Sequence, residues 1–155
     1  MRRTIRRVAS HLTPSPLSLP ALPRILRRMT RPQLAPLEVA ERFFQAVQTG
    51  DIDTLRDLYA PGAEFWHNFD QRNQPAEENI RVIRWMHRRV KDLRYEDVRR
   101  FEIPGGFVQQ HVLRGIAPNG EALEVPAVVI CTIAGGKVTR VEEYLDSAQT
   151  AALNG

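Results

Sequence analysis

Glu143 is the residue whose type and surroundings are best suited to proton transfer. In the stretch 137–146, Val141, Glu143 and Leu145 alternate with polar side chains, so a strand here would carry the carboxylate in an otherwise apolar row. A carboxyl group in such surroundings can act as a general acid or base near neutral pH. The alternative interpretation is structural: Glu143 is hydrogen-bonded to a neighbouring strand, or it forms an ion pair at a dimer interface.

His111 is the second candidate for proton transfer. In the stretch 107–117 it shares one strand face with Gln109, but both faces are mixed, so alternation alone does not show which one is inward. Because histidine titrates near neutral pH, a His111 that faced the same cavity as Glu143 could shuttle a proton or orient a water molecule. Gln109 would then be a substrate-binding residue. Otherwise His111 is a core histidine that is bonded to a carbonyl group.

The aromatic-rich stretch 63–70 supplies the remaining candidates. In a regular strand Trp66, Asn68 and Asp70 share one face, and His67 lies on the other. We expect Trp66 to form a wall of the cavity, with Asn68 and Asp70 as polar substrate-binding groups. His67 is a third candidate for catalysis if a bulge turns its side chain toward the cavity.

Neither a metal nor an organic cofactor is predicted. His67, Asp70, His111 and Glu143 lack the local spacing of a metal site. The single cysteine, Cys131, excludes an internal disulfide and lies in an apolar stretch, where we expect it to be inert. The sequence has no Gly-rich phosphate loop, serine nucleophile elbow or dinucleotide fingerprint.

Helices and a sheet must position these side chains. Helical periodicity and stop signals predict helices over 36–48, from Asp51 to about 59, and over 75–90. Four strand-like runs follow, separated by short Gly-containing spacers that are typical of hairpins, at 94–103, 107–117, 121–133 and 137–146. Helices followed by an antiparallel meander predict an α+β fold with a pocket between helices and sheet.

The charge of the chain is divided unevenly. Its 155 residues are enough for one domain with an extension, and 43% apolar and 26% charged residues are typical of a globular protein. Residues 1–37 contain eight arginines and no acidic residue, so the net charge of +4 combines a basic head with a mildly acidic body. The only features that favour nucleic-acid binding are this basic head and the arginines of 81–89, and we do not expect the domain to bind nucleic acid.

We expect residues 1–35 to be a basic, Pro-rich disordered leader or a mis-annotated start, with Met29 as the true first residue, and residues 36–155 to be the domain. Prolines interrupt the apolar runs of the leader, so neither a secretory signal nor a membrane span is predicted, and a cytoplasmic protein is expected. The alternative is organellar targeting by the arginine-rich, acid-free residues 1–28.

The order of the predicted elements resembles the nuclear-transport-factor-2-like fold over residues 36–152. Within that superfamily, FFQAVQTGDID at 43–53 and GKVTRVEEYLD at 136–146 resemble the SnoaL-like branch. The resemblance implies a cone in which three N-terminal helices pack on a curved antiparallel sheet, with Gln109 and His111 facing inward. We also expect a homodimer, because open sheets of this kind usually pair through their outer faces. Relatives include ketosteroid isomerase, polyketide cyclases and limonene-epoxide hydrolase.

The site residues of these relatives are incompletely matched. The segment 66–68 resembles the aromatic-x-Asn motif of the epoxide hydrolases, and Glu143 falls at their acid, but Gln109 and His111 stand where an Arg-x-Asp pair belongs. Phe43 stands where ketosteroid isomerase has a hydrogen-bonding tyrosine. Neither activity is therefore implied in its standard form.

Two classes of function remain open. We favour a small-molecule-binding enzyme that transfers protons without a cofactor, because Asn68, Gln109, His111 and Glu143 would lie inside an otherwise apolar cone. It would be a cyclase, isomerase, dehydratase or hydrolase acting on an apolar oxygenated molecule. The alternative is a non-catalytic ligand-binding or dimeric assembly module. A pocket on the order of a few hundred Å³ favours the first class, and a cone filled by its own side chains favours assembly.

Overall fold

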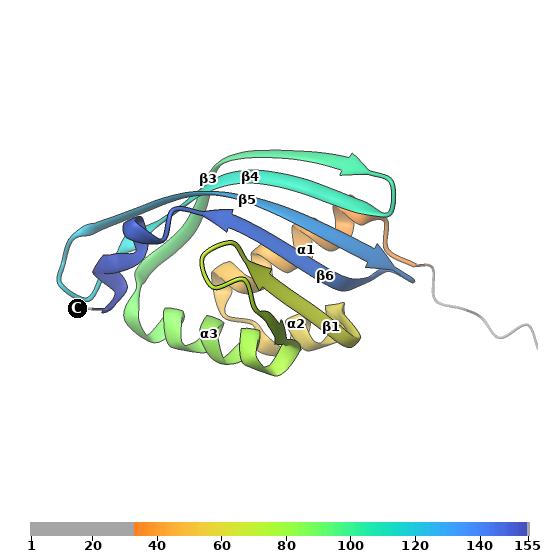
Figure 1. Cartoon of the computed structure of the whole chain (residues 1–155), viewed down its shortest axis with the longest axis horizontal. Helices are drawn as coiled ribbons and strands as arrows, with labels where there is room; N and C mark the ends of the chain where they lie inside the picture. The colour runs from red at the N-terminus through yellow and green to blue at the C-terminus, as the bar shows by residue number, and fades with distance from the viewer. Residues whose placement is uncertain (1–32, 155) are drawn as a thin grey trace, which may run out of the picture. The chain divides into compact units, whose positions relative to one another are not determined.

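The computed structural model describes residues 33–154, which form three α-helices, six strands and one 3₁₀-helix (Figure 1). The helices are α1 (Pro36–Thr49), α2 (Ile52–Leu58), α3 (Ala76–Arg89) and the 3₁₀-helix η1 (Ser147–Asn154). The strands are β1 (Tyr59–His67), β2 (Asn73–Pro75), β3 (Lys91–Ile103), β4 (Gly106–Ile116), β5 (Ala122–Ala134) and β6 (Lys137–Leu145). The leader up to residue 32, a start at Met29 and organellar targeting by residues 1–28 lie outside the described residues.

The predicted first helix is confirmed by α1. Its buried side chains, such as Val39, Phe43 and Val47, recur at helical spacing and face the sheet. Pro36 occupies the first turn, and Gly50 ends the helix in the left-handed conformation, with φ of 71°. In Figure 1 the sheet curves over α1, so this helix lies on the concave side.

The first strand begins earlier than predicted. We expected a strand from Ala63, after a helix stopped by Pro61 and Gly62, but β1 starts at Tyr59. The pairing of β1 with β6 shifts register between Tyr59 and Glu64. Pro61 lacks a backbone N–H and Gly62 has φ of 77°, so both residues fit an irregularity within a strand and do not have to end an element.

The six strands form one sheet in the order β2-β1-β6-β5-β4-β3. The predicted antiparallel meander is confirmed by β3 to β6. One pairing departs from the antiparallel pattern: β1 runs parallel to β6, with Phe65 opposite Val141 and His67 opposite Glu143. No short turn joins these two strands, so no hairpin fixes their relative direction.

The predicted third helix is confirmed by α3, which buries Ile80 and Ile83 and exposes Arg81 and Arg84. Two core clusters result. The larger one joins α1, α2 and β1 to the inner face of the sheet, and the smaller one contains Val90, Leu93, Leu123, Val125 and Leu153.

Within residues 33–154, no helix combines the length and the apolar character that crossing a lipid bilayer requires.

Candidate active site

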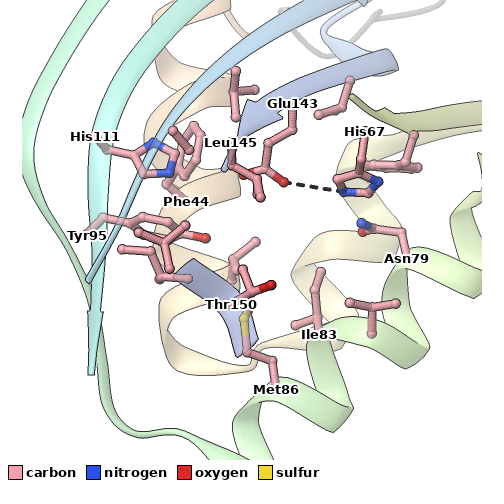
Figure 2. Close-up of a pocket in the computed structure, with 18 of the residues that line it drawn as sticks. Phe44, His67, Asn79, Ile83, Met86, Tyr95, His111, Glu143, Leu145 and Thr150 are labelled. Atoms are coloured by element: carbon pink, nitrogen blue, oxygen red, sulfur yellow. Dashed lines mark ion pairs between the residues drawn. The ribbon is translucent and has the colours of Figure 1, made fainter. Parts of the chain in front are cut away.

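A pocket of about 250 Å³ lies where the two core clusters meet. Its wall comes from α1, β1, α3, the inner face of the meander and η1 (Figure 2). Most lining residues are aliphatic or aromatic, but His67, His111 and Glu143 all belong to the wall. Two of its apolar lining residues, Phe69 and Val82, are 52% and 42% exposed and mark its opening. The three residues predicted as catalytic therefore share one cavity.

His67 and Glu143 form an ion pair inside the pocket. The parallel register of β1 and β6 sets them side by side, with 3.3 Å between Nε2 of His67 and Oε2 of Glu143. Burial by itself lowers the pKa of His67, but the hydrogen bond to Glu143 and the charges of Glu143 and Asp70 outweigh burial and raise the pKa above its ordinary value. The imidazolium form of His67 is therefore favoured beside the carboxylate.

The side chains of β1 point the opposite way from the expected orientation. Trp66 and Asn68 are not among the lining residues. The ring of Trp66 packs against Tyr144 on the outer face of the sheet, with the ring centroids 5.3 Å apart. Asn68 binds the end of β6: its Nδ2 donates to the carbonyl of Leu145, and its Oδ1 accepts from the Leu145 N–H, both at 3.0 Å. Asn68 thus binds the end of β6, and it does not line the pocket as we expected of a substrate-binding residue.

The burial of Phe65 explains this orientation. Both rows of β1 carry aromatic side chains, so alternation did not choose between them. Phe65 shares the inward row with His67, is 1% exposed and packs on Tyr59 with ring centroids 4.8 Å apart. Complete burial of a phenylalanine contributes roughly 1.5–3 kcal/mol. An inward Trp66 would need a partner for its indole N–H in a mostly apolar cavity.

Asp70 also lies outside the pocket lining, but it is hydrogen-bonded to a residue that lines the pocket. Its Oδ2 accepts a hydrogen bond from Nε2 of Gln74, and its Oδ1 accepts one from the backbone N–H of Arg72, both at 3.1 Å. Gln74 does line the pocket, and its buried Oε1 has no partner within the described part of the chain. Asp70 therefore positions a polar lining residue that the sequence analysis missed.

Gln109 and His111 both face inward, as the resemblance implied. Gln109 is fully buried and His111 is 4% exposed. Nε2 of Gln109 lies 3.1 Å from Nδ1 of His111, and Oε1 of Gln109 accepts a hydrogen bond from Nε of Arg100 at 2.7 Å. Because Gln109 is not a lining residue, it supports His111 and does not contact the pocket itself, contrary to its expected role in substrate binding.

The surroundings of His111 favour its neutral form. Its ring packs edge-on against Phe44 and Tyr95, with centroid distances of 5.3 and 4.7 Å. Burial lowers the pKa of His111, and the charge of Arg100 lowers it further, against the charge of Glu143, which raises it. The net shift is downward, opposite to that of His67.

Tyr95 and Asn79 are lining residues that the sequence analysis missed. Burial raises the pKa of Tyr95 far above its ordinary value, so its hydroxyl stays protonated. Asn79, on α3, accepts a hydrogen bond from the hydroxyl of Tyr59 at 2.8 Å. Both could have been found: Tyr95 has the same strand parity as buried Leu93, and Asn79 precedes Ile83 by one helical turn.

Among residues 33–154, no group of three or more histidine, cysteine or acidic side chains is arranged to hold a metal ion. Cys131 is buried, and burial raises the pKa of its thiol to about 12. The thiolate form is therefore scarce near neutral pH, in agreement with an inert core residue.

Comparisons with known proteins indicate the family of the chain. A family model of the SnoaL-like domain matches residues 40–141. IdmH from Streptomyces antibioticus, a "putative polyketide cyclase", is 18% identical with a TM-score of 0.68, and the match covers 79% of this chain and 100% of IdmH. A "putative polyketide cyclase" from Pseudomonas putida is 18% identical with a TM-score of 0.66, covering 76% and 96%. A protein with a ketosteroid isomerase-like fold from Catenulispora acidiphila, in complex with trimethylamine, is 12% identical with a TM-score of 0.62, covering 71% and 86%. No curated protein matches the sequence.

Proposed function

The chain belongs to the SnoaL-like family, and we propose on this premise that it is an acid/base enzyme acting on a small, mostly apolar molecule that contains oxygen. The reaction moves a proton without an organic cofactor, as in cyclisation, isomerisation, dehydration or hydrolysis. The observation that carries the proposal is the pairing of His67 with Glu143, at 3.3 Å, inside a largely apolar pocket.

Glu143 is the proposed base. Its Oε2 is engaged by His67, whereas no hydrogen-bond partner for Oε1 is found within residues 33–154, so Oε1 is available to substrate. Glu143 takes a proton from a carbon next to a carbonyl group, and the electron pair of the C–H bond forms a C=C bond while the π pair of the carbonyl moves onto its oxygen. In a hydrolysis, Glu143 instead takes a proton from the attacking water molecule. His67 balances the negative charge of the carboxylate before transfer and can return a proton to the product afterwards.

The dimensions of the pocket support a small substrate. A cavity of about 250 Å³ is slightly smaller than the roughly 300–1,000 Å³ that is usual for small-molecule sites. Its wall is built from side chains such as Phe44, Ile83 and Val129, which bind hydrocarbon surface without hydrogen bonds. A compact ring system with a carbonyl or hydroxyl group satisfies both constraints.

Hydrogen–deuterium exchange of a model ketone tests the proposal without knowledge of the natural substrate. We expect the protein to accelerate exchange of the C–H groups beside the carbonyl of 1-tetralone in D₂O, followed by proton NMR. Glu143→Gln should reduce this rate by about 10²–10⁴-fold. The matched control is Glu142→Gln, because Glu142 has the opposite strand parity and binds Arg140 at 3.1 Å; its rate should be unchanged. Equal rates for Glu143→Gln and the wild type would exclude Glu143 as the base.

The same experiment separates the enzyme from a non-catalytic module. If 1-tetralone binds to the wild type but its exchange is no faster than in buffer, the acid/base proposal is wrong and a ligand-binding function is favoured. Binding is measured in parallel by chemical-shift titration. The two outcomes differ in the rate alone, so they cannot be confused.

We further propose that two copies pair through the outer face of the sheet. Phe101 and Tyr144 are 58% and 43% exposed, and the register places Phe101, Val108 and Ile130 in one row across this face. Exposed apolar surface of this kind is typical of an interface. Sedimentation analysis should give a dimer for the wild type and a monomer for Tyr144→Glu. A monomeric wild type at micromolar concentration would refute the pairing.

A further inference from the structure

The hydrogen bonds around Gln109 determine which nitrogen of His111 carries a proton. A guanidinium group can only donate, so the Gln109 atom that lies 2.7 Å from Nε of Arg100 must be the carbonyl oxygen Oε1. The amide nitrogen of Gln109 then faces Nδ1 of His111 at 3.1 Å. Because an amide NH₂ also donates, Nδ1 must accept and cannot hold a proton. The proton of the neutral imidazole is therefore on Nε2.

The reversed amide is disfavoured at this position. Turning Gln109 over would bring its NH₂ group against the Nε–H of Arg100 and leave both donors without an acceptor. Gln109 is fully buried, so water cannot relieve such a conflict, and each unpaired buried group costs about 1–3 kcal/mol. Arg100 is itself held by Glu41, at 2.8 Å, and lies over the ring of Phe44 with 5.7 Å to its centroid.

The Nε2–H of His111 is an unused donor. Figure 2 shows the ring of His111 pointing into the pocket, and Nε2 is buried without a partner within residues 33–154. Buried donors are almost always paired, so an unpaired one in a pocket wall indicates a place for a ligand acceptor. The hydroxyl of Tyr95, another lining residue, has no hydrogen-bond partner in the described part of the chain either.

The neighbours of His111 preserve this state. Phe44 from α1 and Tyr95 from β3 present aromatic rings, and Arg100 from β3 adds a positive charge behind Gln109. Glu143 from β6 lines the same pocket and acts on the ring through its negative charge. Burial and the charge of Arg100 keep the pKa of His111 low, so a second proton on Nδ1 is disfavoured.

We propose that Arg100 and Gln109 are positioning residues that hold His111 as a neutral, fixed hydrogen-bond donor, and that its Nε2–H binds the acceptor oxygen of a ketone, an ester or the enolate derived from it. His111 then does not shuttle protons, which was one of the two roles expected from the sequence. When Glu143 removes a proton from carbon, the electron pair moves to the oxygen that His111 holds. This catalytic use rests on the proposed function, whereas the tautomer of His111 does not.

Long-range ¹H–¹⁵N correlation spectra of the full chain, labelled at histidine, test the tautomer without any ligand. We expect a neutral ring with the proton on Nε2, identified by its loss in His111→Phe. In Gln109→Glu the new carboxylate can only accept, so the proton should move to Nδ1 or occupy both nitrogens. Gln110→Glu is the matched control, because Gln110 is an exposed neighbour of opposite parity, and its spectrum should match the wild type.

Arg100→Gln provides a second variant if Gln109→Glu does not fold. Removing the guanidinium frees the amide to turn over, so we expect the two neutral tautomers of His111 to coexist. A proton on Nδ1 in the wild type would overturn the assignment. The wild-type tautomer persisting unchanged in every folded variant would overturn the roles of Arg100 and Gln109.

The ligand class is tested with 1-tetralone and tetralin, which share a ring skeleton but differ in the carbonyl oxygen. We expect wild-type protein to bind the ketone about 5- to 10-fold more tightly than the hydrocarbon, the effect of one net hydrogen bond. His111→Phe should abolish this preference. Glu143→Gln should retain it while losing exchange activity, so failure of this proposal and failure of the proposed function give different results. Equal affinities in the wild type, or no ketone binding, would refute the ligand class.

Discussion

His111 is buried and His67 is partly buried, and their neighbours give the two histidines of the pocket opposite protonation preferences. On the side of β1 and β6, the carboxylate of Glu143 lies at one ring nitrogen of His67, and the pKa of His67 is raised. On the side of β3 and β4, an amide backed by an arginine lies at one ring nitrogen of His111, and its pKa is lowered. Burial lowers the pKa of both histidines, and the direction of the net shift differs because only His67 has a carboxylate hydrogen-bonded to its ring.

Removing the amide between Arg100 and His111 should have the largest effect on stability. Gln109→Leu leaves Nε of Arg100 and Nδ1 of His111 without their shared partner, which should lower the free energy of unfolding by about 2–4 kcal/mol. Gln110→Leu, on the exposed face, should stay within about 0.5 kcal/mol of the wild type. Urea unfolding measures both variants. If Gln109→Leu and Gln110→Leu were equally stable, the β3–β4 side would not depend on this hydrogen-bond network.

Replacing the charged partner on the other side should act on rate and leave binding intact. His67→Gln can still donate a hydrogen bond to Glu143 but carries neither a charge nor a transferable proton. We expect the exchange rate of 1-tetralone to fall by about 10–100-fold. Affinity for the ketone, measured by titration, should change by less than about twofold, because the acceptor oxygen lies at His111. A variant that lost affinity but kept its rate would reverse the roles of the two histidines.

The pH dependence of stability should have opposite slopes on the two sides of about pH 6.5, the ordinary value for an unfolded histidine. Folded His67 binds its proton more tightly than the unfolded chain does, so its contribution is full below about pH 6.5 and is lost as pH rises through its raised pKa. Folded His111 resists protonation, so stability falls as pH drops from about 6.5 toward its lowered pKa.

Urea unfolding across this pH range checks both signs. His67→Gln should remove part of the loss at higher pH, and His111→Gln should remove part of the loss at lower pH. If both variants changed the free energy of unfolding on the same side of about pH 6.5, the pKa values of the two histidines would not be shifted in opposite directions.

Asp70→Asn should produce the smallest effect and act on one histidine only. Asp70 contributes to the raised pKa of His67 through its charge, after Glu143, and is absent from the causes of the His111 shift. NMR titration should therefore show a lower pKa for His67 and an unchanged one for His111. The asparagine oxygen can still accept from Gln74, so the pocket wall should stay in place. An equal decrease for both histidines would indicate a change in structure.

The parts of the site that local pattern could predict are those that lie on regular strands. Alternation placed Glu143 among Val141 and Leu145, and all three line the pocket. The short Gly-containing spacers predicted the meander, because the residues of a hairpin turn themselves determine that the chain reverses there. For Gln109 and His111 the inward direction came from the resemblance, since both faces of β4 have mixed composition.

The remainder depends on contacts between distant segments. Trp66 and Phe65 are both aromatic, so the orientation of β1 depends on which of them the core buries better. The pairing of His67 with Glu143 needs a register between strands that no local turn sets. Thr150 and Leu153 enter the pocket wall from η1, whose position depends on the finished sheet. None of these contacts can be predicted from the spacing of apolar and polar residues along the sequence.

The parallel pairing of β1 with β6 has a consequence for the order of folding. His67 and Glu143 belong to strands that are separated along the chain by α3 and the rest of the meander, so joining them closes a long loop, whereas the meander forms through short hairpins. Contacts of high sequence separation usually form slowly. During refolding, strand content should therefore recover before the ion pair does. The wall of the pocket that contains His67 and Glu143 would then be the last part of the structure to form.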